Sequence, residues 1–188
     1  MQFERQELRD PAVVIAFSGW NDAGNAASDS ALWLMENYPS HEWGRIEDER
    51  FYDFQASRPN LRRGADGPWI QWPHTTFEIV NHPERDLLVV VGPEPSLLWR
   101  TFVGELVDKI QLAEPELVVL LGALLSDTPH SRPLPVSVVS REPGLQEILG
   151  ISESDYEGPT GVIGVASQAL AIASIPTASL WVSVPHYV

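Results

Sequence analysis

Short apolar runs rich in β-branched residues alternate along the chain with segments in which apolar residues recur every three or four positions. The runs are typical of strands buried on both faces, and the spaced pattern is typical of helices with one buried side. Strands are predicted at residues 13–17, 87–91, 117–122, 135–140 and 178–184. Helices are predicted from Asn21 or Asp22 to Tyr38, from Pro95 or Ser96 to Ile110, at 144–149 and at 162–173. Asn21 or Asp22 is a suitable N-cap for the first of them.

Strands that alternate with helices imply a mainly parallel sheet with right-handed crossovers and helices on both of its faces. The predicted fold class is therefore α/β, a three-layer α/β/α sandwich. A length of 188 residues suits one well-filled core, so residues 1–188 are expected to form a single domain.

Between residues 43 and 80 the pattern changes to aromatic and β-branched residues interleaved with charges, at 43–54 and 69–80, around a polar loop at 57–68. This pattern predicts a β-hairpin insertion. A two-stranded ribbon cannot bury both of its faces alone. Its aromatic residues either fold back on the core of the chain or make an aromatic contact between subunits of a homo-oligomer, and the residues concerned are Phe51, Tyr52, Trp69 and Trp72.

The turn after the first strand is the first place to look for a ligand, because ligands of open α/β sheets bind at the carboxyl ends of strands. Turns that follow other strands or precede helices contribute more polar and glycine residues to the same rim. The candidate cleft consists of Gly19, Trp20, Asn21, Asp22, Gly24, Glu94, Glu157, Gly158, Thr160 and His186.

Several chemistries can be weighed at this rim. Gly19 and Gly24 have the glycine spacing of a phosphate-binding P-loop, but Asn25 stands where that loop needs lysine. Glu94 and Glu157 are either an acid/base pair, if one carboxyl is desolvated, or residues that serve turns and helix starts.

Two further features each have two interpretations, one as a binding site and one as a structural feature. The glycine-rich segment 158–164 at a helix start either binds an anion or allows close helix packing. His186 is either a base or phosphate ligand, or a hydrogen-bonded histidine of the rim. The five histidines lack zinc-site spacing, so we expect no metal. No Gly-x-Ser-x-Gly elbow occurs, which disfavours a serine hydrolase. We also expect no cofactor.

The composition disfavours some classes of binding partner. A net charge of −14 disfavours nucleic acid and anionic membrane surfaces. The sequence has no cysteine, no signal-peptide pattern at its start and no apolar run near the ~20 residues that span a bilayer. These features predict a cytoplasmic protein.

Four segments together resemble the proteasome assembly chaperone 2 family in its actinobacterial branch: 19–24, 92–95, 157–161 and 179–187. The resemblance implies an α/β/α core similar to that of purine nucleoside phosphorylases and related hydrolases, assembled as a homotrimer. It also implies a link to proteasome assembly, which relatives in eukaryotes and archaea have. Members of this branch continue past the position of His186 into a helical segment, which we expect to be absent from this chain.

The resemblance favours a protein-assembly or protein-interaction role without catalysis. The alternative is a nucleoside phosphorylase-like or hydrolase-like enzyme, or a small-ligand-binding protein, that uses the cleft at the carboxyl ends of the strands. An assembly factor would use the aromatic ribbon, whereas an enzyme would use the rim.

Overall fold

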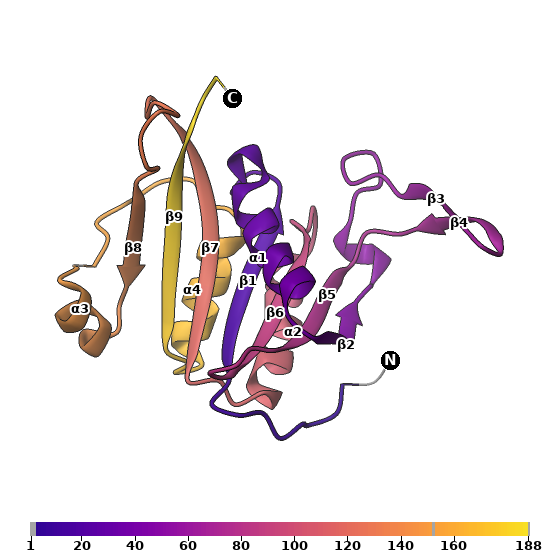
Figure 1. Ribbon diagram of the computed structural model, residues 1–188, viewed down its shortest axis with the longest axis horizontal. Helices are drawn as coiled ribbons and strands as arrows, with labels where there is room; N and C mark the ends of the chain where they lie inside the picture. The colour runs from indigo at the N-terminus through magenta and orange to yellow at the C-terminus, as the bar shows by residue number, and fades with distance from the viewer. Residues whose placement is uncertain (1–2, 152, 188) are drawn as a thin grey trace.

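The computed structural model describes residues 3–151 and 153–187 (Figure 1). Most of its strands join one sheet: β1 (Ala12–Ser18), β2 (Ser40–Ile46), β5 (Thr75–Asn81), β6 (Asp86–Pro93), β7 (Leu117–Ser126), β8 (Val136–Ser140) and β9 (Thr177–Pro185). Their order across this seven-stranded sheet is β2-β5-β6-β1-β7-β9-β8. The four strands β6, β1, β7 and β9 run parallel, and β2, β5 and β8 extend the sheet as antiparallel neighbours.

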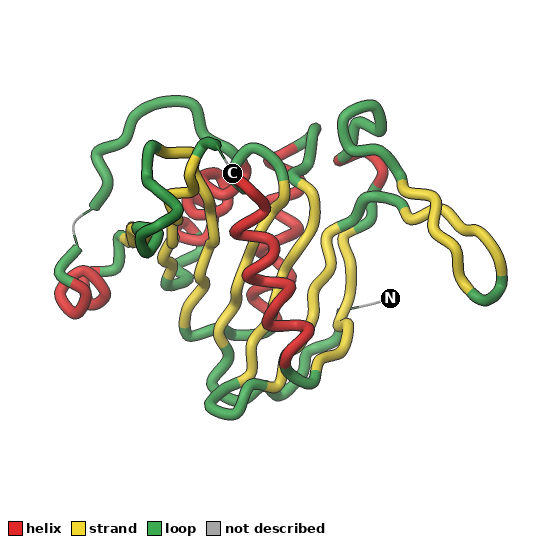
Figure 2. Tube along the Cα trace, turned by 45° about the horizontal axis from the view of Figure 1, so that its top comes forward, coloured by secondary structure: helices red, strands yellow, loops and turns green. Residues whose placement is uncertain are grey.

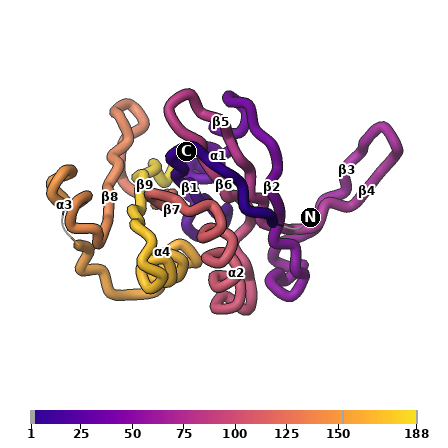
Figure 3. The backbone as a smooth tube through the Cα atoms, turned by 90° about the horizontal axis from the view of Figure 1, so that it is seen from below, coloured from indigo at the N-terminus to yellow at the C-terminus, as the bar shows by residue number. Residues whose placement is uncertain are grey.

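Helices cover both faces of this sheet: α1 (Ala26–Asn37), α2 (Trp99–Leu112) and α4 (Val162–Ile172). Helix α1 packs on one face, and α2 and α4 lie together against the other (Figure 3). The predicted three-layer α/β/α class is therefore confirmed. A short helix, α3 (Pro143–Leu149), lies beside the edge strand β8. No helix among the described residues is both long and apolar enough to cross a membrane.

The two sides of the sheet are packed with side chains of different size. Small residues such as Ala16 and Ala123 on the sheet meet Ala27 and Ala31 of α1, so this helix approaches the sheet closely. The opposite side holds the bulky core, where buried aromatic and branched side chains fill the space under α2 and α4. The ring of Phe17 lies 5.7 Å from that of Phe102, measured between centroids. Most of the apolar burial therefore supports the α2 and α4 layer.

Helix α2 begins later than the sequence predicts, at Trp99 rather than at Pro95 or Ser96. The backbone N–H groups of Ser96 and Leu97 donate to the carbonyl of Phe51, at 2.8 and 3.1 Å. Leu98 then adopts a left-handed conformation with φ of 53°. A tertiary contact to the segment after β2 therefore holds these residues out of the helix.

The predicted insertion divides into two parts. Its outer strands, β2 and β5, pair with each other at the edge of the main sheet. Only β3 (Asn60–Gly64) and β4 (Gly67–Gln71) form a separate two-stranded hairpin, which projects away from the sheet (Figure 2). The prediction of a loop over 57–68 is wrong in part, because β3 lies within it.

Two of the four aromatic residues assigned to a subunit contact are instead core residues. Phe51 is fully buried with its ring 5.3 Å from that of Phe102, and Tyr52 is buried with its hydroxyl 3.2 Å from that of Thr75. Burial raises the pKa of the Tyr52 phenol above its ordinary value. The 3-10 turn η2 (Glu49–Phe51) aims both side chains inward, which strand periodicity alone does not predict.

Truncation of Phe51 tests this correction. We expect Phe51→Ala to lower the free energy of unfolding by about 3–5 kcal/mol, because it removes a fully buried ring from a close-packed core. The matched variant Trp69→Ala removes an aromatic ring that is half exposed and should change stability by less than about 1 kcal/mol. Urea denaturation measures both. Equal losses in the two variants would contradict the placement of Phe51 in the core.

Candidate functional site

The turn after β1 is fixed by its own backbone. Gly19 adopts φ of 134°, which favours glycine, and its carbonyl accepts a hydrogen bond from the N–H of Asp22 at 3.2 Å. The carbonyl of Asn21 accepts from the N–H of Ala123 at 2.7 Å, which ties the turn to β7. Asn21 and Asp22 are buried, whereas the Trp20 side chain is 65% exposed. The turn is a rigid connection in which only some of the predicted residues face solvent.

Asp22 holds the start of α1. Its carboxylate accepts from the backbone N–H of Ala27 at 2.8 Å and of Ser28 at 3.2 Å, and from the Ser28 hydroxyl at 2.5 Å. A 3-10 turn, η1 (Ala23–Asn25), separates Asp22 from the helix, and Gly24 within it has φ of 62°. Asp22 therefore has the predicted capping role, although Asn25 occupies the N-cap position itself.

Glu94 occupies the start of α4. Its Oε1 accepts from the backbone N–H of Val162 at 2.7 Å and from Nδ2 of Asn21 at 3.3 Å. A Cβ atom on Gly161 would overlap Nδ2 of Asn21, so only glycine permits this approach. The free N–H groups of a helix start attract an anion, and here the carboxylate of Glu94 is that anion. One carboxylate thus joins β6, the turn after β1 and helix α4.

The other predicted rim residues do not join this cluster. Glu157, Gly158 and Thr160 are exposed on the segment before α4, and within the described residues no hydrogen bond connects Glu157 to Glu94. Glu94 instead serves a helix start, which was the other interpretation of this residue.

His186 belongs to a separate group at the ends of β7 and β9. Its Nδ1 lies 3.3 Å from the carbonyl oxygen of Ser126 and 3.4 Å from Oδ1 of Asp127. The neighbouring Tyr187 hydroxyl accepts from the N–H of His130 at 3.0 Å. The described part of the chain holds no group of three or more side chains arranged to bind a metal ion.

The hairpin β3–β4 forms the second candidate surface, which we call the arm, residues 58–72. The arm exposes large apolar side chains along both of its strands, with Leu61 at 66%, Trp69 at 52%, Ile70 at 46% and Trp72 at 54% exposure. Cross-strand pairs place Leu61 opposite Ile70 and Arg62 opposite Trp69. One face of the arm is thus mainly apolar, and the other combines an aromatic ring with a guanidinium.

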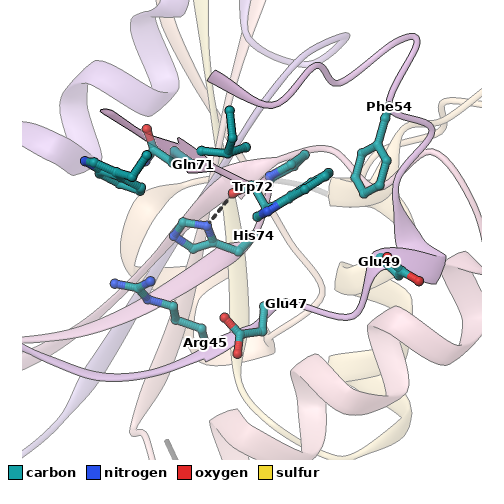
Figure 4. A pocket seen from close by; sticks show the side chains of 10 residues that line it. Arg45, Glu47, Glu49, Phe54, Gln71, Trp72 and His74 are labelled. Atoms are coloured by element: carbon teal, nitrogen blue, oxygen red, sulfur yellow. Dashed lines mark hydrogen bonds between the residues drawn. The ribbon is translucent and has the colours of Figure 1, made fainter. Parts of the chain in front are cut away.

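A groove of about 520 Å³ lies where the arm meets the sheet (Figure 4). The ring of Trp72 packs on Phe54 with centroids 5.0 Å apart, and Nδ1 of His74 lies 2.8 Å from the carbonyl oxygen of Trp72. These contacts fix the base of the arm. The lining residues are Arg45, Glu47, Glu49, Phe54, Trp69, Ile70, Gln71, Trp72, Pro73 and His74.

A second groove, of about 660 Å³, continues from the arm to the turn after β1. Gly19 and Pro93 line it on the side of the strand ends, and Arg58 and Arg62 line it on the side of the arm. No sequence motif pointed to these arginines. The available signal was their clustering, because three of the chain's twelve basic residues lie in the arm.

The fold and site define a class: an α/β/α protein in which a carboxylate of the chain itself occupies the helix start at the strand ends and a projecting arm exposes two tryptophans. Comparison with known proteins agrees with this fold. The chain belongs to the PAC2 family, which it matches over residues 16–188. No curated protein matches the chain.

Solved structures show the same fold. A PAC2 family protein from Streptomyces avermitilis is 42% identical with a TM-score of 0.87, over 95% of this chain and 77% of that one. A proteasome-assembly chaperone homologue from Mycobacterium tuberculosis is also 42% identical, with a TM-score of 0.85 over 94% of this chain and 76% of that one. PbaB of Pyrococcus furiosus, an archaeal proteasome activator, shares the fold at 15% identity, with a TM-score of 0.77 over 99% of this chain and 80% of that one.

The role of Glu94 can be tested by substitution. Glu94→Ala leaves the N–H of Val162 and Nδ2 of Asn21 without this acceptor, and a buried donor left unsatisfied costs about 1–3 kcal/mol. We expect a loss of that size in the free energy of unfolding, measured by urea denaturation. Glu94→Gln keeps an oxygen acceptor and should lose less.

Glu157→Ala is the matched control, because it removes an exposed carboxylate from the same predicted pair. Its stability should stay within about 0.5 kcal/mol of the unchanged chain. An unchanged free energy of unfolding in Glu94→Ala, or an equally large loss in Glu157→Ala, would rule out the structural role of Glu94.

Proposed function

We propose that this protein acts in protein assembly, through contacts that its arm makes with other protein surfaces, and that it works as a homo-oligomer in the cytoplasm. The observation that carries the proposal is the contrast between the two candidate surfaces. At the strand-end rim, the carboxylates of Glu94 and Asp22 accept hydrogen bonds from within the chain. The arm, in contrast, exposes two tryptophans. Aromatic residues are the commonest anchors of protein interfaces.

The relatives support the same assembly role. The PAC2 family includes the 42% identical proteasome-assembly chaperone homologue, so proteasome core subunits are the client to test first. A homotrimer, which the family resemblance implies, is the expected form of the oligomer. Glu94 lends no specific support to a nucleoside phosphorylase-like or hydrolase-like reaction, because its carboxylate accepts hydrogen bonds from Val162 and Asn21 within the chain.

The test measures binding of the full chain to purified actinobacterial proteasome core subunits by light scattering and native electrophoresis. We expect a complex, and a dissociation constant at least tenfold weaker when Trp69→Ala and Trp72→Ala are combined, since anchor residues of this kind each contribute about 1–2 kcal/mol or more. The weakening arises directly or through loss of the homo-oligomer, in which several copies bind together.

The control is Trp20→Ala, because Trp20 is as exposed as the arm residues but belongs to the strand-end turn. It should leave binding unchanged. Absence of any complex, or weaker binding in Trp20→Ala than in the arm variant, would contradict the proposal.

A further inference from the structure

Two outlying elements of the structure bury almost nothing in their own chain. Every residue of β3 is exposed, and β4 has only exposed or half-buried residues. Helix α3 has seven residues, none of them buried, and it contacts only β8 closely among the secondary-structure elements. An isolated hairpin and an isolated short helix are both marginal in water, because neither recovers the cost of ordering its backbone. Each element would gain stability if a further surface covered it.

The two elements carry opposite charge. The arm has three arginines, Arg58, Arg62 and Arg63, and a single acidic residue, Asp66, in a chain of net charge −14. The segment that includes α3 and the residues after it, 142–151 and 153–157, has five acidic residues and no basic one. We call this segment the acidic edge. Glu153 makes an ion pair with Arg141 at 2.8 Å, and the exposed Glu147 and Asp155 make none of the chain's described ion pairs.

Both elements also expose apolar side chains next to their charges. Leu61 and Ile70 pair across the arm beside Arg63, and Ile148 and Leu149 of α3 are 80% and 51% exposed beside Glu147. An apolar centre with a charged rim is the usual composition of a protein interface. The arm and the acidic edge are therefore complementary in both respects.

The two elements cannot reach each other within one chain. The arm extends beyond β2 and β5 at one end of the sheet, and α3 lies beside β8 at the other (Figures 1 and 3). A contact between them must join two copies of the chain.

We propose that the arm of one copy docks on the acidic edge of the next, so that copies associate head to tail. This inference rests on the proposed homo-oligomer and names its contact. The arm then supports binding to other proteins by holding together an oligomer in which several copies bind at once. An interface made of two different surfaces repeats from copy to copy and closes into a ring when the rotation allows. Opposite charges also direct the encounter and disfavour the arm-to-arm pairing, in which arginines would face arginines.

Charge reversal tests the contact on the full chain. The arm-reversed variant carries Arg62→Glu with Arg63→Glu, and the edge-reversed variant carries Glu147→Arg with Asp155→Arg. Sedimentation velocity should show that each variant alone associates on the order of 100-fold more weakly than the unchanged chain, because like charges then face each other. A chain that carries all four substitutions should associate again, since the charges are complementary once more.

Controls with the same change in net charge are Arg100→Glu with Arg132→Glu, and Asp29→Arg with Glu36→Arg, all on exposed residues outside both surfaces. They should associate normally. Ile148→Ser, which changes no charge, should weaken association as well, and thermal melting should show that every variant stays folded.

Three results would overturn the contact: an unchanged chain that is monomeric at all concentrations, an edge-reversed variant that associates normally, or a four-substitution chain that stays dissociated. Binding of proteasome subunits is measured separately. A monomer that still binds them would refute the head-to-tail contact and leave the assembly role standing, whereas an oligomer that binds no client would do the reverse.

Discussion

The carboxylate of Glu94 on the first turn of α4 is the contact on which the arrangement of this protein depends. It comes from the end of β6, accepts from the backbone of α4 and from the side chain of Asn21 after β1, and so fixes three separate segments at one point. Gly161 has no side chain, which lets these groups approach. The same contact fills the position where many α/β proteins hold a phosphate or a substrate carboxylate. The joining of these three segments and the occupation of this helix start are thus consequences of one interaction.

Two exposed surfaces lie at the two ends of the sheet, away from this helix start. The arm and the acidic edge are poor in buried contacts within the chain and rich in exposed apolar side chains. They lie at opposite edges of the sheet, the arm beyond β2 and β5 and the acidic edge beside β8. A protein built in this way is suited to bringing surfaces together, which agrees with the proteasome-assembly homologue among its relatives.

Much of the fold could be predicted because its signals are local. The β-branched runs at 13–17 and 87–91 predicted strands and lie in β1 and β6. The helical spacing at 162–173 predicted a helix and corresponds to α4. The residues of the strand-end turn were also identified, including the capping role of Asp22. What could not be predicted depends on contacts between distant segments. The carbonyl of Phe51 delays the start of α2, and burial against Phe102 removes the Phe51 ring from the surface. The partner of Glu94 is likewise 68 residues away along the chain.

The central claim is that this protein acts through the arm rather than through the strand-end rim. Hydrogen–deuterium exchange of backbone amides, followed as the protein is concentrated from monomer to oligomer, tests it most directly. The account predicts slower exchange on association in residues 60–71 and in α3, with no change at 19–24 or at the start of α4. Protection confined to the strand-end turn, with the arm exchanging as fast as in the monomer, would contradict it.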